Sequence, residues 1–178
     1  MTTETLTLSL LDARGVEEHL EELAEMLHAC VNDGASINFI LPYSLEDARS
    51  FWRRKVLDRL RAEDPLVVMV ARQGGRIAGS VQLDCDTPPN QAHRAEIKKL
   101  MVHPAFQRRG IGRRLMVEIE RIARQRGLSL LTLDTRTGDK GEPLYLSVGF
   151  TVAGIIPDYA RDAVVDRLDA ATFMYKQL

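Results

Sequence analysis

The chain has 178 residues, 45% of them hydrophobic and 28% charged, so it can bury a sizeable core and is unlike a disordered chain. Its formal net charge of -1 argues against a general affinity for nucleic acid or anionic membranes. The longest apolar run, residues 66–71, is far shorter than the ~20 residues of a membrane span, and the first residues lack a signal-peptide pattern. Only two cysteines are present, Cys30 and Cys85, so no disulfide framework is indicated, and we expect a cytoplasmic protein.

Periodicity along the first half of the chain predicts a strand, two helices and a pair of strands. Leucines alternate over residues 5–11, which is typical of a strand, and apolar residues recur at helical spacing over 16–31. Ser44 is a suitable N-cap for the second helix, because acidic residues follow it in the first turn. The runs 66–71 and 76–84 flank a glycine pair and form a predicted hairpin.

The second half of the chain continues the alternation of strands and helices. Its predicted elements are a strand over 94–102, a helix over 111–126, a strand over 128–133, a short helix over 142–147, a strand over 150–156, a charged loop over 158–169 and a last strand over 171–176. Because a helix connects 94–102 to 128–133, these two strands are expected to be parallel neighbours. Strict alternation along 94–102 places Glu96 and Leu100 on one face and Lys99 on the other. These elements predict one mixed α/β domain over residues 1–178.

A loop rich in glycine and arginine, Gln107–Gly112, lies between the strand 94–102 and the helix that follows. The first amides of a helix have no partner within the helix, so such a loop suits a phosphate or a pyrophosphate. Two glycines permit close approach of the backbone and three arginines add positive charge: Gly110, Gly112, Arg108, Arg109 and Arg113. The loop lacks the lysine of a Walker A motif and lies too late for a Rossmann fingerprint. Alone, it is also compatible with a glycine loop that carries solvated arginines.

The stretch from Arg94 to Phe150 resembles the GCN5-related N-acetyltransferase (GNAT) family. The matching elements, in family order, are the strand 95–102 followed by His103-Pro104, the loop Gln107–Gly112, the amphipathic helix, the strand 130–135, and Leu144-Tyr145 leading to Gly149-Phe150. A narrower resemblance, over 32–36, 94–102 and 133–135, is to the tabtoxin-resistance acetyltransferases within that family. The chain departs from many members at Gly138, where they carry an asparagine seven residues before the tyrosine.

The resemblance implies a mostly antiparallel mixed sheet with a central parallel splay and helices on both faces. It also implies that acetyl-CoA is the cosubstrate, that no metal is needed, and that the cofactor lies in the splay. Backbone groups of the strand would pair with the pantetheine amides, as an added strand does. The residues expected to bind the cofactor are Leu100, Met101, Val102, Gln107, Arg108, Arg109, Gly110, Ile111, Gly112 and Arg113.

Three side chains are candidates for the chemistry. By resemblance, Tyr145 is the general acid that protonates the departing thiolate, and its alternative role is structural packing. An alkyl amine has a pKa near 10.4, so it must lose a proton before it attacks a thioester. Either Glu96 or Asp134 would accept that proton or attract the amine. Asp134 would do so from the end of its strand. The alternative for each is an ordinary ion pair, with Lys98 or Arg136.

The resemblance therefore predicts an enzyme that transfers acetyl from acetyl-CoA to a primary amine by direct attack in a ternary complex. A small-molecule acceptor, amino-acid-like or a toxin, is the first hypothesis, and a closed pocket lined by 158–169 would favour it. The alternatives are a protein N-terminus or lysine as acceptor, which needs a long open groove, and a non-catalytic acyl-CoA-binding regulatory module. No nucleic-acid or membrane partner is expected, and the chain is predicted to be a monomer or a homodimer through its last strand.

Overall fold

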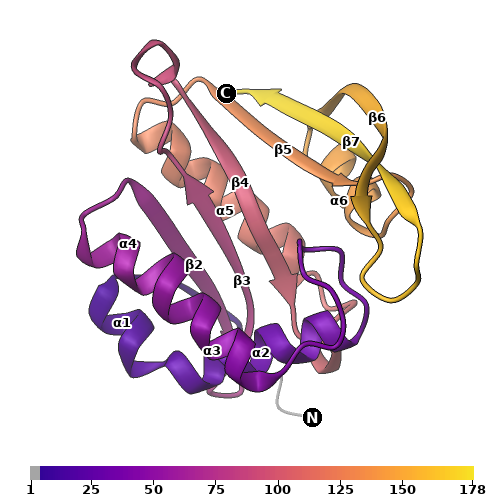
Figure 1. Ribbon diagram of the computed structural model, residues 1–178. Helices are drawn as coiled ribbons and strands as arrows, with labels where there is room; N and C mark the ends of the chain where they lie inside the picture. The colour runs from indigo at the N-terminus through magenta and orange to yellow at the C-terminus, as the bar shows by residue number, and fades with distance from the viewer. Residues whose placement is uncertain (1–4) are drawn as a thin grey trace.

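The structure, a computed structural model, describes residues 5–178 and is built on a seven-stranded sheet in the order β1-β2-β3-β4-β5-β7-β6 (Figure 1). The strands are β1 Thr7–Leu11, β2 Leu66–Gln73, β3 Arg76–Asp84, β4 Arg94–Val102, β5 Leu130–Arg136, β6 Thr151–Arg161 and β7 Leu168–Gln177. Within the described chain, β4 and β5 form a parallel pair and every other neighbouring pair is antiparallel. The mixed α/β prediction with a central parallel pair is confirmed.

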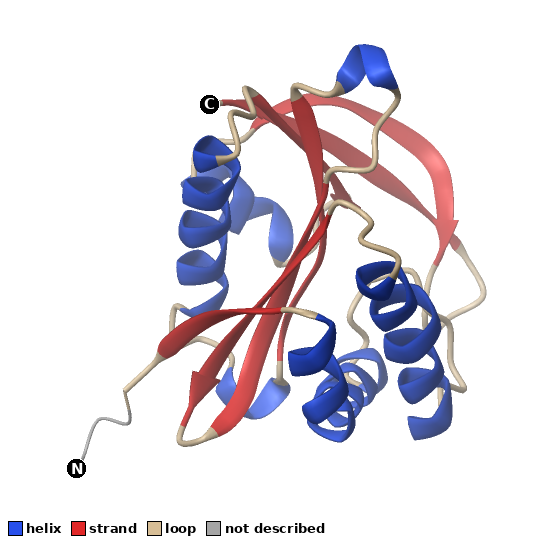
Figure 2. Cartoon of the chain, turned by 90° about the vertical axis from the view of Figure 1, so that its left-hand side faces the viewer, coloured by secondary structure: helices blue, strands red, loops and turns tan. Residues whose placement is uncertain are grey.

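Helices cover both faces of the twisted sheet, as Figure 2 shows. The helices are α1 Ala13–Glu18, α2 Leu20–Asn32, α3 Leu45–Phe51, the π-helical turn η1 Trp52–Leu57, α4 Asp58–Arg61, the short 3-10 turns η2 Pro89–Gln91 and η3 Pro104–Phe106, α5 Ile111–Gln125 and α6 Gly141–Ser147. The first three α-helices and η1 bury one apolar layer, with Trp52 fully enclosed, and α5 buries the other. Strand β2 contributes to both layers, which is why its apolar run is continuous. No helix among residues 5–178 is long and apolar enough to cross a membrane.

The parallel pair opens shortly after it begins, and this opening is the feature that positions the site. Strands β4 and β5 are paired only from Arg94 to Glu96 and from Leu130 to Thr132. Beyond Glu96 one edge of β4 no longer has β5 as its partner, while its other edge stays paired with β3 up to Val102. The predicted splay between the two strands is therefore present.

A β-bulge in β4 overturns the alternation expected along that strand. Lys99 has a φ of 51°, and the register with β3 shifts at the same place. The extra residue keeps Lys99 on the α2–α3 face with Lys98, while Leu100 packs into the α5 layer. The prediction that Glu96 and Leu100 share a face is therefore wrong, because a bulge moves every later side chain to the opposite face.

Several element boundaries also differ from the prediction. The helix expected over 16–31 is two helices, because the chain turns at His19, and Asp12 caps the first by accepting a hydrogen bond from Gly15 N–H. The strand expected to end at residue 133 runs to Arg136, so Asp134 lies inside β5. The predicted loop 158–169 belongs partly to β6 and β7. Strand β7 lies between β5 and β6, so the last strand has no free edge for another subunit.

Candidate active site

The loop before α5 has the backbone geometry of an anion site. Gly110 is the N-cap of α5 with a φ of 76°, and no side chain caps the helix. The first intrahelical bond of this turn runs from Arg114 N–H to the Gly110 carbonyl, so the amides of residues 111–113 have no helical partner. Arg108 is also left-handed, with a φ of 64°. Successive amides of such a turn converge on one point, where an anion is stabilised.

The loop's polar side chains are committed to holding its shape rather than pointing freely outward. Arg109 donates to the Ala105 carbonyl at 3.1 Å and lies 5.3 Å from the Phe106 ring centroid. Arg113 donates to both oxygens of Ser147 on α6, and Gln107 Nε2 donates to Asp33 and to the Val102 carbonyl. Within residues 5–178, Arg108 is exposed and has no hydrogen bond or ion pair. Backbone amides are therefore the main donors of this loop, with Arg108 the guanidinium left for an anion.

Close packing holds the loop against its strand. A Cβ on Gly79 of β3 would lie 2.7 Å from the Met101 carbonyl oxygen, so only glycine lets β3 approach β4 here. A Cβ on Gly112 would meet Leu144 of α6 at 3.1 Å. His103 N–H donates to the Ala78 carbonyl at 2.9 Å. Because backbone groups alternate along a strand, Val102 directs its N–H to the opposite edge, which faces the splay.

Tyr145 lies on α6 beside the splay, partly buried, with its ring 6.1 Å from that of Phe150. A Cβ on Gly141 would lie 3.1 Å from the Tyr145 ring, so the glycine makes room for it. Burial raises the pKa of the phenol above its usual value, and the charges of Asp134 and Asp139 raise it further. Within the described chain, the hydroxyl has no hydrogen-bond partner. Tyr145 thus offers a neutral, unoccupied proton donor.

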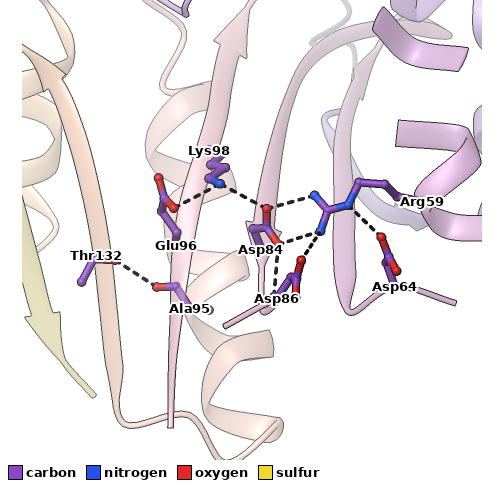
Figure 3. Close-up of polar contacts among 8 residues, drawn as sticks. All are labelled: Arg59, Asp64, Asp84, Asp86, Ala95, Glu96, Lys98 and Thr132. Carbon is purple, nitrogen blue, oxygen red and sulfur yellow. Dashed lines mark hydrogen bonds and ion pairs between the residues drawn. The ribbon is translucent and has the colours of Figure 1, made fainter. Parts of the chain in front are cut away.

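The two candidate carboxylates lie in different environments. Glu96 is at the last paired position of β4 and forms an ion pair with Lys98 at 3.1 Å. Lys98 also forms an ion pair with the buried Asp84. Arg59 donates two hydrogen bonds of 3.0 Å to the same carboxylate (Figure 3). In contrast, Asp134 lies on β5 beyond the segment paired with β4, and its carboxylate has no hydrogen bond or ion pair within residues 5–178. Its negative charge acts to raise the pKa of both Tyr145 and Lys99.

The sequence suggested residues 158–169 as the lining of an acceptor pocket, but it did not reveal that the 33–44 loop meets them. The 33–44 loop, between α2 and α3, contacts the 162–167 turn, between β6 and β7, through a 3.0 Å hydrogen bond from Leu41 N–H to the Ala163 carbonyl. In the view of Figure 1 the dark purple loop lies beside this yellow turn. The sequence also did not reveal that Lys99 contacts this loop. Its Nζ donates a hydrogen bond to the Ile37 carbonyl at 2.7 Å. Two consecutive lysines inside a half-buried strand were the signal for the bulge.

The 162–167 turn is held by a buried carboxylate. Asp162 accepts hydrogen bonds from the N–H groups of Val164 and Val165, and these bonds lower its pKa to about 2. The same carboxylate pairs with Arg136 of β5 at 2.8 Å and with Arg167 at 3.3 Å. Arg136 is thus paired with the turn and not with Asp134. The turn is consequently anchored to the strand that carries Asp134.

Neither cysteine is suited to act as a nucleophile. Cys30 is 3% exposed, and burial raises its thiol pKa to about 12. Burial raises the pKa of the Cys85 thiol as well. Within residues 5–178, no three His, Cys, Asp or Glu side chains are gathered as metal ligands would be. The groups at or beside the splay are therefore backbone amides, the carboxylates of Glu96 and Asp134, a lysine ammonium and the Tyr145 phenol.

A helix start with unpartnered amides, a strand edge freed from its neighbour and an unbonded phenol beside the splay are compatible with an acyltransferase that uses an acyl-CoA. The chain belongs to the Acetyltransferase (GNAT) family, whose sequence model matches residues 18–150. It is accordingly an acetyl-CoA-dependent N-acetyltransferase.

Individual relatives agree with this assignment. An uncharacterized N-acetyltransferase from the hisH-hisA intergenic region of Azospirillum brasilense is 30% identical over 126 residues, which cover 70% of this chain and 72% of that protein. The N-alpha-acetyltransferase RimI of Mycobacterium tuberculosis is 37% identical over 99 residues, or 54% of this chain and 59% of that protein. The acetyltransferase yncA of Salmonella typhimurium, solved with its cofactor acetyl-CoA, shares the fold with a TM-score of 0.76 and 21% identity, covering 97% of this chain and 94% of that chain. The narrower resemblance to tabtoxin-resistance enzymes stays a prediction.

Replacing Gly110 with Glu is expected to weaken CoA binding at least tenfold, because a left-handed φ strains any side chain and the new carboxylate repels the pyrophosphate. Gly75 is a matched control, since it has the same φ of 76° and, like Gly110, open space where a Cβ would lie, but it belongs to the β2–β3 turn. Calorimetric titration with CoA should show normal affinity for Gly75→Glu. Equal affinity in the two folded variants would remove the loop from the phosphate site.

Proposed function

We propose that the chain acetylates the primary amine of a small molecule, amino-acid-like or a toxin, by direct attack in a ternary complex. The observation that carries this proposal is the contact between the 33–44 loop and the 162–167 turn, made by Leu41 and Ala163. The two segments meet on the face of the sheet to which Asp134 belongs, because Leu131 and Leu133 point to the opposite, α5 layer. A closed site suits a compact acceptor, whereas a protein acceptor needs a continuous groove.

The cofactor-binding assignment follows the geometry of the splay. The amides of residues 109–112 would hold the pyrophosphate, and the free edge of β4 over Leu100–Val102 would pair with the pantetheine amides. An N–H near Val102 would stabilise the negative charge that develops on the thioester oxygen. Acetyl-CoA supplies the activated acetyl group.

Asp134 is the favoured general base. Its carboxylate has no competing ion pair in the described chain, while Glu96 is neutralised by Lys98 at 3.1 Å. Asp134 would take the proton of the ammonium, directly or through water, and the neutral amine would attack the acetyl carbon. Tyr145 would give its proton to the departing thiolate. Glu96 stays the second candidate because it lies at the vertex of the splay.

Acetylation of a protein N-terminus is the second candidate function. It is favoured by the similarity to the mycobacterial protein named N-alpha-acetyltransferase RimI. A non-catalytic acyl-CoA-binding module is less well supported, because neither the Tyr145 hydroxyl nor the Asp134 carboxylate has a hydrogen-bond or ion-pair partner in the described chain.

An acceptor panel distinguishes these functions. Free amino acids, small mono- and diamines, and short peptides with free N-termini are each incubated with acetyl-CoA, and the thiol released is measured. The proposal predicts the highest kcat/KM for a small amine, with mass spectrometry showing the N-acetyl product. A kcat/KM highest for peptides would transfer the assignment to a protein acceptor, and CoA binding without any turnover would favour the binding module.

A further inference from the structure

Lys99 connects β4, the strand proposed to pair with the cofactor, to the 33–44 loop. The bulge at Lys99 turns its side chain toward this loop, where Nζ donates to the Ile37 carbonyl at 2.7 Å. The same ammonium lies 5.1 Å from the ring centroid of Phe39, in the loop, and 5.9 Å from that of Phe51, at the end of α3. Aromatic faces at these distances attract a cation. A single side chain therefore holds the loop by one hydrogen bond and one ring contact, and a second ring contact joins it to α3.

The position is costly for an ammonium, so it is not a solvated surface lysine. Burial lowers the pKa of Lys99 to about 8, with Lys98 acting in the same direction and the charges of Asp134 and Glu96 opposing it. Within residues 5–178 no carboxylate lies within ion-pair distance of its Nζ. A partly buried cation without a carboxylate partner costs free energy, which must be offset by the contacts it does make. Those contacts are with the 33–44 loop and with Phe51 at the C-terminal end of α3.

The loop held by Lys99 is tied at its other end to the 162–167 turn. Lys99 binds the carbonyl of Ile37, and Leu41, four residues on, donates to Ala163 of the turn. A chain of contacts thus runs from β4 through the loop to the turn. Immediately after the bulge, Leu100 begins the segment of β4 whose free edge faces the splay.

We propose that Lys99 is a positioning residue that fixes the 33–44 loop in its closed arrangement and so controls affinity for the acceptor. The proposal rests on the proposed function in one respect, namely that the acceptor lies between the loop and the 162–167 turn. Without Lys99 the closed arrangement would be only partly populated, and the apparent acceptor affinity would fall by that fraction. The main chain of Leu100–Val102 would keep its conformation, so CoA affinity would stay unchanged.

The first test is hydrogen–deuterium exchange of the whole chain, with and without CoA, in Lys99→Met. Methionine keeps the length and apolar character of the stem but removes the charge and the donor. Losing a charged hydrogen bond should speed exchange of the Leu41 amide roughly 10- to 100-fold. Lys98→Met is the matched control, since it removes the same charge one residue away and should leave Leu41 exchange unchanged. Unchanged exchange in Lys99→Met would overturn the proposal.

The second test separates positioning from folding and from the acceptor assignment. Lys99→Arg retains the charge and donors, and it should keep Leu41 exchange and the melting temperature close to wild type. With the most active amine of the acceptor panel, Lys99→Met should raise KM at least tenfold while changing kcat and the Kd of CoA less than twofold. An equal loss of CoA affinity would overturn the positioning role. Fast Leu41 exchange with an unchanged amine KM would show that Lys99 holds the loop, but it would contradict an acceptor site beneath the loop.

Discussion

Replacing Tyr145 with Phe is expected to lower kcat roughly 10- to 1,000-fold while the Kd of CoA stays unchanged. The ring would keep its contact with Phe150, and the hydroxyl has no hydrogen-bond partner in the described chain, so the melting temperature should not fall. Because burial raises the pKa of Tyr145 above its usual value near 10, the phenol stays protonated and no decline of kcat is expected below pH ~10.

The exposed Tyr175 of β7 provides a control, because Tyr175→Phe deletes the same hydroxyl elsewhere in the sheet. Its kcat should equal that of the wild type, with both variants assayed where chemistry limits the rate. An unchanged kcat in Tyr145→Phe would return Tyr145 to a packing role and leave water to protonate the thiolate.

Replacing Asp134 with Asn is expected to lower kcat/KM for the amine roughly 100-fold or more at neutral pH, where the acceptor arrives protonated. The amide keeps the shape of the side chain but cannot accept the proton as readily. Above the pKa of the amine the acceptor is already neutral, so the defect should shrink as the pH rises. The measurement is the pH dependence of kcat/KM for wild type and variant.

Glu96→Gln is the comparison that decides between the two carboxylates. Glu96 is bound to Lys98, so its replacement should cost less than that of Asp134. A defect confined to Glu96→Gln, or an Asp134→Asn defect that does not change with pH, would exclude Asp134 as the general base.

Features that depend on local sequence were predictable. Ser44 forms a capping box with Asp47, and α5 begins where the glycine loop predicts. The apolar stripe of the helix predicted after Ser44 is buried around Trp52, as helical spacing requires. The parallel pair followed from the right-handed crossover through α5, and the splay followed from the family resemblance.

Features that depend on contacts between distant segments were not predictable. Alternation alone cannot reveal a bulge, so the side of the sheet on which Lys99 lies was assigned wrongly. The pairing of Glu96 with Lys98 and of Arg136 with Asp162 decides which carboxylate is free, and only the folded structure sets these pairs. The contact between Leu41 and Ala163 joins segments more than a hundred residues apart, which no local pattern encodes.

In the proposed mechanism, acetyl passes directly from acetyl-CoA to a small amine while both lie in the splay. This mechanism can be tested by measuring the initial velocity of thiol release as acetyl-CoA and the most active panel amine are varied together. Direct transfer predicts intersecting double-reciprocal lines, in keeping with the buried Cys30 and its raised thiol pKa. Parallel lines would show that an acetylated enzyme forms before the amine binds, and that result would exclude direct transfer.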